Sequence, residues 1–302
     1  MSVQNLSKAY GSLQAVRETS FDIAEGEIFG LLGPNGAGKT TTLECIIGLR
    51  RPDGGSIHIA GVDALADPAK AKELVGVQLQ ATNLYDKITP RQALRLFGSF
   101  YAHAADPAAL LAQFDLMEHA DRVFATLSGG QQQRLALAIA LVNRPRVVCL
   151  DEPAANLDPR VRRTLHEAIL ALKSAGCAVL LTTHHIDEAE KLCDRVAIMY
   201  RGTIVATGKP RDLIAAAKTS PTVSVRMTRT LDPAVMAAIA GVAGTKRDGD
   251  TWRLRTSSVP QTIAGIARLA EAQSNELLEL QIQNPTLEDV FLELTGEPLG
   301  GT

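Results

Sequence analysis

The chain has 302 residues, of which 46% are hydrophobic and 21% are charged, and its formal net charge is −2. This length predicts about two domains, and the near-neutral charge disfavours a nucleic-acid-binding protein that relies on a basic surface. No stretch reaches the roughly 18 uninterrupted apolar residues of a membrane helix, so a role at a membrane would require a partner that spans it. The start of the chain also lacks the basic segment and apolar core of a secretion signal.

The first predicted strand, residues 27–32, runs into a glycine-rich stretch, and helical spacing follows over residues 40–49. Strand, glycine-rich loop and helix is the context of a phosphate-binding P-loop, whose pattern G-x-x-x-x-G-K-[ST] is matched from Gly33 to Thr40. Glycines let backbone amides approach the phosphates at the positive end of a helix. Lys39 would reach the outer phosphates, and Thr40 would place its hydroxyl on Mg²⁺. We expect a nucleoside triphosphate to be bound by the residues of this loop: Gly33, Pro34, Asn35, Gly36, Ala37, Gly38, Lys39, Thr40 and Thr41.

Further along, apolar strands alternate with helices. Residues 75–80 and 146–150 read as strands, residues 161–173 as a helix, and residues 178–182 as another strand. This alternation predicts an α/β fold with a mostly parallel sheet flanked by helices. Residues 90–141 are helical in pattern with little strand signal, so we expect a helical subdomain, at about residues 81–141, inserted in this first domain of residues 1–215.

Two motifs in this region point to phosphate chemistry. Asp151 and Glu152 end a buried-strand pattern, where P-loop ATPases place the aspartate that holds magnesium. A solvated acidic turn is the alternative for such a pair. The other motif, Leu-Ser-Gly-Gly-Gln at residues 127–131, opens a helix, and a helix N-terminus with bare glycine amides is an anion site. Because the chain already has its own P-loop, a second phosphate-seeking loop implies a different nucleotide molecule.

The pattern changes at residues 216–221, where we place a domain boundary. The remainder, residues 221–302, predicts the order β-α-β-β-α-β, which suggests a small ferredoxin-like α+β domain. Asp232 and Pro233 resemble the start of a helix that we expect to extend over residues 234–242. A final helix should begin after Thr286, with Asp289 completing a capping box. The other elements expected here are strands at residues 221–228, 243–247, 251–256 and 277–283 and a helix at residues 260–273.

A P-loop, then Leu-Ser-Gly-Gly-Gln, then a strand that ends in Asp-Glu resembles the nucleotide-binding subunits of ATP-binding cassette (ABC) proteins over residues 1 to about 215. The resemblance implies an ATPase that converts ATP and water to ADP and phosphate with Mg²⁺. It implies that Asp151 holds Mg²⁺, that Glu152 polarises the attacking water and that His184 contacts the γ-phosphate. His185 is a neighbouring rival for the role of His184.

The same resemblance implies that Gln80, at the end of its strand, senses magnesium and water; Gln78 is the rival. Tyr10 matches the aromatic residue that stacks on adenine, although a lone tyrosine fits a packing role equally well. In the family, two subunits meet head to tail, so that Ser128, Gly129, Gly130 and Gln131 of one cover the ATP of the other. Asn156, Leu157 and Asp158 would lie at that interface, in a homodimer or a heterodimer with a related ATPase subunit. Family members usually carry Ser-Gly where this chain has Ala155 and Asn156.

The tail, residues 284–296, resembles that of ATP-binding subunits of drug and antibiotic exporters of the daunorubicin-resistance type. This implies a cytoplasmic subunit on the inner face of the membrane, beside a separate permease that residues 82–101 would contact, and export of a drug, antibiotic or lipid-like cargo. An importer ATPase shares every catalytic residue and is the nearest alternative. Soluble ABC ATPases that act on ribosomes or DNA usually have two cassettes or long coiled coils, whereas this chain has one P-loop and no sustained heptads. Glu152 and His184 disfavour a purely regulatory ATP-binding protein.

Overall fold

A computed structural model describes residues 1–80, 84–155, 157–229 and 231–299, which form two compact units. The first contains Met1–Leu213 together with Leu299, and the second spans Ile214–Pro298. The division falls just before the stretch 216–221 at which the sequence pattern changes. Within the described residues, no helix has the length and apolar character needed to cross a membrane.

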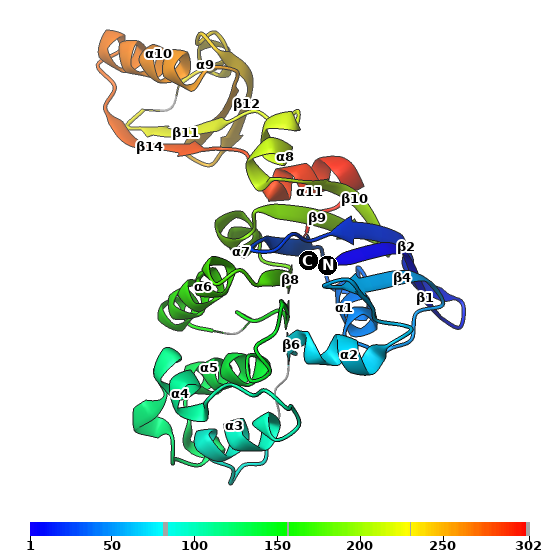
Figure 1. The fold of residues 1–302 in the computed structure, drawn as a ribbon. Helices are drawn as coiled ribbons and strands as arrows, with labels where there is room; N and C mark the ends of the chain where they lie inside the picture. Colours follow the sequence, from blue (N-terminus) through cyan, green and yellow to red (C-terminus); the bar gives the residue numbers. More distant parts are fainter. Residues whose placement is uncertain (81–83, 156, 230, 300–302) are drawn as a thin grey trace. The chain divides into compact units, whose positions relative to one another are not determined.

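The first unit is built on a six-stranded sheet with the order β10-β9-β3-β8-β7-β6 (Figure 1). Five of these strands are parallel, and β10 pairs antiparallel with β9. Every residue of β3, β7 and β8 is buried, as in sheets that are covered on both faces. The expected α/β fold with a mostly parallel sheet is therefore confirmed. The strands are β3 (Ile28–Leu32), β6 (Val75–Gln78), β7 (Val147–Asp151), β8 (Ala178–Thr183), β9 (Arg195–Tyr200) and β10 (Thr203–Gly208).

The sequence did not predict a second sheet in this unit, which is antiparallel with the order β2-β1-β4-β5. Buried and exposed side chains alternate only irregularly along its strands, because the pairing of β1 with β2 shifts register at three places. Phe21 of β2 stacks on Phe29 of β3 with ring centroids 5.2 Å apart, so the two sheets share one apolar core. The strands are β1 (Ser2–Tyr10), β2 (Leu13–Asp22), β4 (Gly54–Ile59) and β5 (Val62–Asp63).

Helices cover the six-stranded sheet and also form the expected helical subdomain (Figure 1). Helix α1 (Lys39–Ile46) follows the P-loop, α6 (Pro159–Ser174) and α7 (Ile186–Leu192) follow β7 and β8, and α2 (Pro68–Glu73) precedes β6. In the subdomain, Leu94 of α3, Leu111 of α4 and Leu135 of α5 are buried, and the three helices contact one another. The subdomain comprises α3 (Pro90–Gly98), α4 (Pro107–Gln113), the short 3-10 helices η1 (Met117–His119) and η2 (Phe124–Thr126), and α5 (Gly129–Ala140).

The second unit has an antiparallel sheet with the order β12-β13-β11-β14, the strand order of a ferredoxin-like fold. Helix α9 ends earlier than predicted, because the chain turns at Gly241 (φ 86°) and Val242 donates to the Ile239 carbonyl. The predicted capping box at Thr286 is confirmed. After α8 (Pro210–Ala216), the elements are β11 (Thr222–Met227), α9 (Pro233–Ala237), β12 (Val242–Asp248), β13 (Thr251–Thr256), α10 (Val259–Ala272), β14 (Leu277–Gln283) and α11 (Leu287–Thr295).

Candidate functional site

The P-loop lies between the end of β3 and the start of α1, and its lysine is buried. The Lys39 ammonium donates hydrogen bonds to the carbonyl oxygens of Gly33, at 2.7 Å, and Pro34, at 3.0 Å. Burial lowers the pKa of Lys39, while the charges of Glu152 and Asp151 oppose that shift. The loop thus holds a positive charge inside a concave backbone, as a phosphate site requires.

Two P-loop positions require glycine because other backbone segments approach them closely. A Cβ atom on Gly33 would overlap the carbonyl oxygen of Met199 in β9, and one on Gly38 would overlap that of Ala15 in β2. Gly38 also has a φ of 105°, which residues with side chains rarely adopt. Tight contacts with both sheets therefore fix the shape of the loop.

At the end of β7, Asp151 faces the start of α1. Its Oδ1 accepts a hydrogen bond from the Thr40 hydroxyl at 3.4 Å and another from the buried Thr182 hydroxyl. Burial raises the pKa of Asp151, although these hydrogen bonds oppose the shift. Mg²⁺ prefers oxygen ligands, and its own charge would offset the cost of this buried carboxylate. The Thr40 and Asp151 oxygens therefore suit a magnesium ion that also binds phosphate.

Three predicted site residues converge on the carboxylate of Glu152, which is 9% exposed. Oε1 lies 3.0 Å from His184 Nδ1 and 3.7 Å from Lys39 Nζ, and Oε2 accepts a hydrogen bond from Gln80 Nε2 at 3.3 Å. Glu152 has a left-handed φ of 46°, a strained conformation of the kind found at functional sites. Two bonds from its amide hold it there, to the carbonyl and the hydroxyl of Thr182.

The structure gives the rival residues of these motifs different surroundings. Strand β6 ends at Gln78, not at Gln80 as expected from the sequence, and Gln78 is buried with no hydrogen-bond partner for its side chain among the described residues. Gln80 follows the strand and reaches Glu152. The His185 ring lies beside that of His184, with centroids 4.0 Å apart and the ring planes tilted by 40°. Burial and the neighbouring His184 lower the pKa of His185.

A cleft of about 690 Å³ opens over the P-loop. Tyr10 lines it and is 40% exposed, with the Lys8 ammonium 5.6 Å and the Arg50 guanidinium 5.8 Å from its ring centre. No motif indicated the other polar side chains of this cleft, Gln14, Arg17 and Arg201. They arrive through pairing between segments distant in sequence, and the cleft is lined by Tyr10, Leu13, Gln14, Ala15, Arg17, Asn35, Gly36, Gly38, Lys39, Thr40, Thr41, Gln80, Glu152, Arg201 and Gly202.

The signature residues Ser128, Gly129, Gly130 and Gln131 form the first turn of α5. Ser128 is the N-cap and exchanges two hydrogen bonds with Gln131, which leaves the glycine amides at the helix start. None of the four is among the described residues that line the P-loop cleft. Asp158 caps α6 by accepting from the amides of Arg160 and Val161, whereas Asn156 lies outside the described residues.

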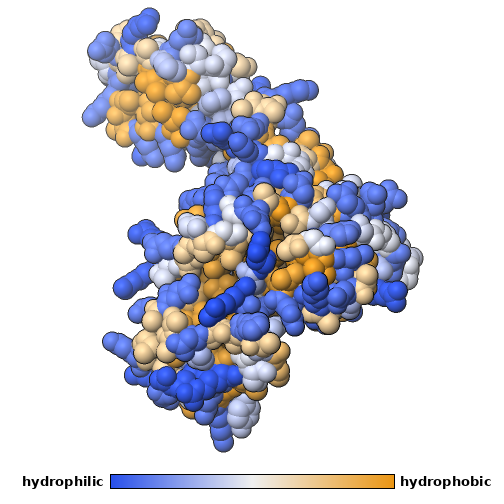
Figure 2. Space-filling model, in the orientation of Figure 1, coloured by the Kyte–Doolittle hydropathy of each residue, from blue (hydrophilic) through white to orange (hydrophobic). Residues whose placement is uncertain are grey.

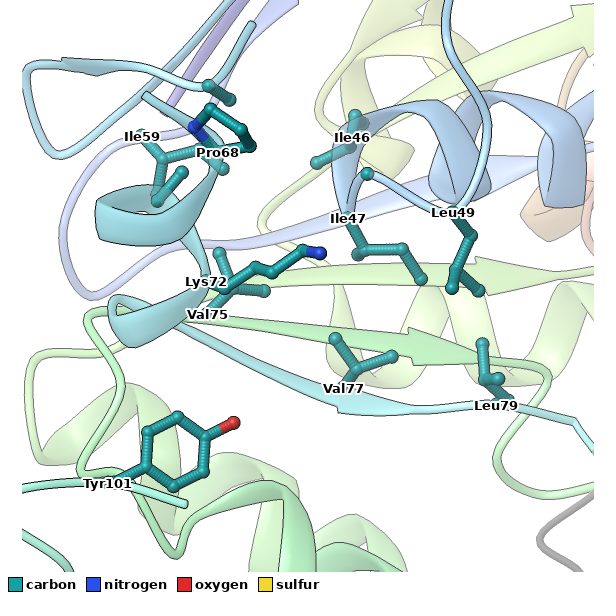
Figure 3. Close-up of a pocket in the computed structure, with 13 residues that line it drawn as sticks. Ile46, Ile47, Leu49, Ile59, Pro68, Lys72, Val75, Val77, Leu79 and Tyr101 are labelled. Atoms are coloured by element: carbon teal, nitrogen blue, oxygen red, sulfur yellow. The ribbon is translucent and has the colours of Figure 1, made fainter. Parts of the chain in front are cut away.

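A second pocket, of about 320 Å³, is apolar (Figure 3). Ile46, Ile47 and Leu49 at the end of α1 lie on one side of it, and Val77 and Leu79 on the other. Tyr101 and Lys72 also line this pocket. The described residues that line it include no cluster of catalytic side chains, so it is suited to apolar contacts rather than to chemistry.

The P-loop, the Asp151–Thr40 pair and the groups gathered on Glu152 define a nucleotide-hydrolysing P-loop protein. Comparison with known proteins gives the family: residues 16–155 match the family described as ABC transporter. The chain is 35% identical to a Nod factor export ATP-binding protein I from Ralstonia nicotianae, over 99% of this chain and 94% of that protein. It therefore belongs to the ATP-binding subunits of ABC transporters, which are ATPases.

Other relatives also match along nearly their whole length. The chain is 34% identical to the linearmycin resistance ATP-binding protein LnrL of Bacillus subtilis, over 99% of each chain. Identity is also 34% to the doxorubicin resistance ATP-binding protein DrrA of Mycobacterium tuberculosis, over 98% of this chain and 93% of that protein. The resemblance to exporter ATP-binding subunits predicted from the tail is thus confirmed.

Solved structures match a share of the chain similar in size to the first unit. An ATP-binding subunit of an ABC transporter superposes with a TM-score of 0.64 at 30% identity, over 71% of this chain and 91% of that one. The ATP-binding cassette MJ0796, solved as a dimer in a post-hydrolysis state with ADP and phosphate, has a TM-score of 0.62 at 26% identity, over 69% of this chain and 97% of that one. The ABC ATPase fold of this unit is therefore established.

Proposed function

We propose that this chain is the ATP-hydrolysing subunit of an ABC exporter and acts through a separate membrane permease. The observation that carries the proposal is the convergence of Gln80, Lys39 and His184 on Glu152 beside the P-loop. Such a carboxylate can orient a water molecule and accept its proton, a contribution worth roughly 100- to 10,000-fold in rate. A regulatory ATP-binding protein would not need it.

In this proposal, Lys39 and the P-loop amides bind the β- and γ-phosphates of ATP, and the adenine ring stacks on Tyr10. Thr40, Asp151 and Gln80 are the residues that would hold Mg²⁺, which neutralises charge on the phosphates when it is bound. Glu152 takes the proton of the attacking water, and His184 contacts the γ-phosphate. The Lys39 ammonium, within 3.7 Å of Glu152 in the nucleotide-free site, would exchange this partner for phosphate oxygens.

The signature turn supports a two-subunit site. Ser128, Gly129, Gly130 and Gln131 offer amides at a helix start but do not line their own chain's P-loop cleft, so they suit the ATP bound by another subunit. Asp158 would lie at the same interface. The similarity to a cassette solved as a dimer supports this arrangement, in a homodimer or a heterodimer with a related ATPase subunit.

Export is favoured over import because the matches to the Nod factor export and drug resistance proteins extend through the second unit. We infer a drug, antibiotic or lipid-like cargo and a position on the inner face of the membrane. Exposed apolar side chains support the predicted permease contact at residues 82–101: Tyr85 is 70%, Leu96 48% and Phe100 67% exposed. Thr82, at the start of this range, lies outside the described residues.

The test is ATP hydrolysis by the purified chain, with and without Mg²⁺. We expect turnover that requires Mg²⁺ and falls by about 100-fold or more in Glu152→Gln. Glu118→Gln, which changes an exposed carboxylate on η1, is the matched control and should keep its rate. Full activity in Glu152→Gln would overturn the assigned role of Glu152. A neighbouring gene for a periplasmic binding protein would instead support an importer.

A further inference from the structure

The two edge strands of the second unit's sheet differ in how well they are protected against pairing with a strand of another chain. Strand β12 carries Lys246, Arg247 and Asp248, all exposed, and its pairing with β13 contains a register shift between Val242 and Gly244. Charged residues and bulges are the devices by which natural proteins prevent an edge strand from pairing with another chain. The β12 edge is therefore protected.

Strand β14 forms the opposite edge, and its own register shift lies at its start, between Leu277 and Glu279, so the segment from Glu279 to Gln283 has no bulge. Its sequence, Leu-Leu-Glu-Leu-Gln-Ile-Gln, contains one charged residue and no proline, and six of its seven residues are exposed. Leu277, Leu278 and Ile282 are 40%, 50% and 43% exposed. Figure 2 shows an apolar area on this unit between α10 and β14, in the orientation of Figure 1. A long edge of this kind favours the addition of a further strand.

The regular part of β14 is Glu279 to Gln283, because its register against β11 shifts between Glu279 and Leu277. Antiparallel pairing of this segment with itself about Gln281 would set Leu280 against Ile282 and Glu279 against Gln283. Pairing about Glu279 would instead oppose two like charges, which is unfavourable. The segment is therefore self-complementary in a register that uses all five residues.

Leu280 packs against the apolar core of the unit, so the even-numbered residues face the helices. In the register centred on Gln281, the pairs of Leu280 with Ile282 lie on the helix side of the joined sheet and extend the apolar core into the second copy. The pairs of Glu279 with Gln283 lie on the other face of the sheet, which is open and includes Glu279, Gln281 and Gln283. These features select a second copy of the same chain as the occupant of this edge.

We propose that β14 pairs antiparallel with β14 of a second copy, about a two-fold axis at Gln281, and joins the two second units through one continuous sheet. The contact needs no nucleotide and is separate from the ATP-dependent contact of the first units. Because an edge pair buries less area than a standard interface, we expect weak, reversible dimers, with a Kd of about tens to hundreds of micromolar.

The first test is sedimentation of the full, nucleotide-free chain at increasing concentration. Gln283→Lys would place a lysine opposite Glu279 of the partner subunit twice, and Gln283→Glu would place a like charge there. The two dissociation constants should differ by about tenfold, with the lysine variant tighter than the wild type. Lys246→Glu on β12 is the control and should leave Kd unchanged. A monomeric wild type, or two Gln283 variants that shift in the same direction, would overturn the proposal.

The second test is oxidative cross-linking in a Cys177→Ser background, since the other three cysteines are buried. Opposed Cα atoms in an antiparallel pair lie about 4.5–5.5 Å apart, within the reach of a disulfide. Gln281→Cys, on the two-fold axis, should form a linked dimer, whereas Gln283→Cys should not. Equal linking of both variants, or of neither, would contradict the register. ATPase activity measured on the same variants distinguishes this outcome from failure of the proposed function.

Discussion

Lys39 is a buried ammonium whose present partners are two loop carbonyls and Glu152. Its charge is held where phosphate oxygens would replace these partners. A hydrogen bond to a charged group contributes about 1.5–3 kcal/mol, so Lys39→Ala should weaken ATP binding by about ten- to a hundredfold or more. Titration calorimetry with Mg-ATP measures this, with the exposed Lys70→Ala as the control. Unchanged affinity would show that Lys39 has no contact with the nucleotide.

The buried carboxyl group of Asp151 should make the stability of the folded, nucleotide-free chain depend on pH. Burial raises its pKa, so the folded nucleotide-free chain binds this proton more tightly than the unfolded chain. The resulting stabilisation is present below the ordinary aspartate pKa and is lost as the pH rises through the raised value. Asp151→Asn removes the buried charge while its side-chain oxygen can still accept from Thr40 and Thr182.

At pH 8, without nucleotide or Mg²⁺, Asp151→Asn should therefore unfold a few degrees higher than the wild type. The difference in Tm should shrink as the pH falls towards 4, because the wild-type carboxylate then becomes neutral. Calorimetric scans across this range provide the measurement. A difference that grows at low pH would contradict the assigned direction of the shift.

At the scale of elements, the start of α5 has two roles that can be separated. Ser128 caps the helix, so Ser128→Ala should cost about 0.5–2 kcal/mol of unfolding free energy. Thr286→Ala removes a similar capping box from α11 and should cost about as much. Only Ser128→Ala should also lower ATPase turnover, because Ser128 would contact the nucleotide of another subunit. Denaturant titration and turnover together test this, and equal loss of turnover in both variants would reduce Ser128 to a structural cap.

The elements that sequence patterns predicted well are those with continuous apolar runs or strong end signals. Strands β3, β7 and β8 are buried throughout, and α11 has a complete capping box. Strands β1 and β2 were missed because they are half-exposed and their register shifts break the alternation. Helix α9 was predicted too long, because the turn at Gly241 overrides the helical preference of the alanines before it.

At the site, too, residues in local motifs could be predicted from the sequence, whereas residues brought in by pairing between distant segments could not. Lys39, Asp151 and Glu152 stand in local motifs whose spacing reveals them. Arg17 and Arg201 enter the cleft because the Arg17 amide donates to the Gly202 carbonyl, and the Gly202 amide donates to Ala37 of the P-loop. These bonds join segments far apart in sequence, and no local pattern encodes them. Gln80 was assigned from the sequence with Gln78 as its rival, and the structure adds the hydrogen bond from Gln80 to Glu152, which no local pattern indicates.

At the scale of the whole molecule, the chain carries a P-loop and a signature turn that do not line one cleft. We therefore predict that ATP is enclosed between two copies, or between this chain and a related subunit. The edge pairing proposed for β14 would add a nucleotide-independent association. A variant that disrupts that pairing, Gln283→Glu, gives a background in which the effect of ATP on assembly can be measured separately.

The most direct measurement is the solution mass of Glu152→Gln in this background, by sedimentation at saturating Mg-ATP. We predict a monomer without nucleotide, a dimer that retains one ATP per chain, and a return to monomer when ADP replaces ATP. A single chain that remains monomeric while fully loaded with ATP would contradict the shared site.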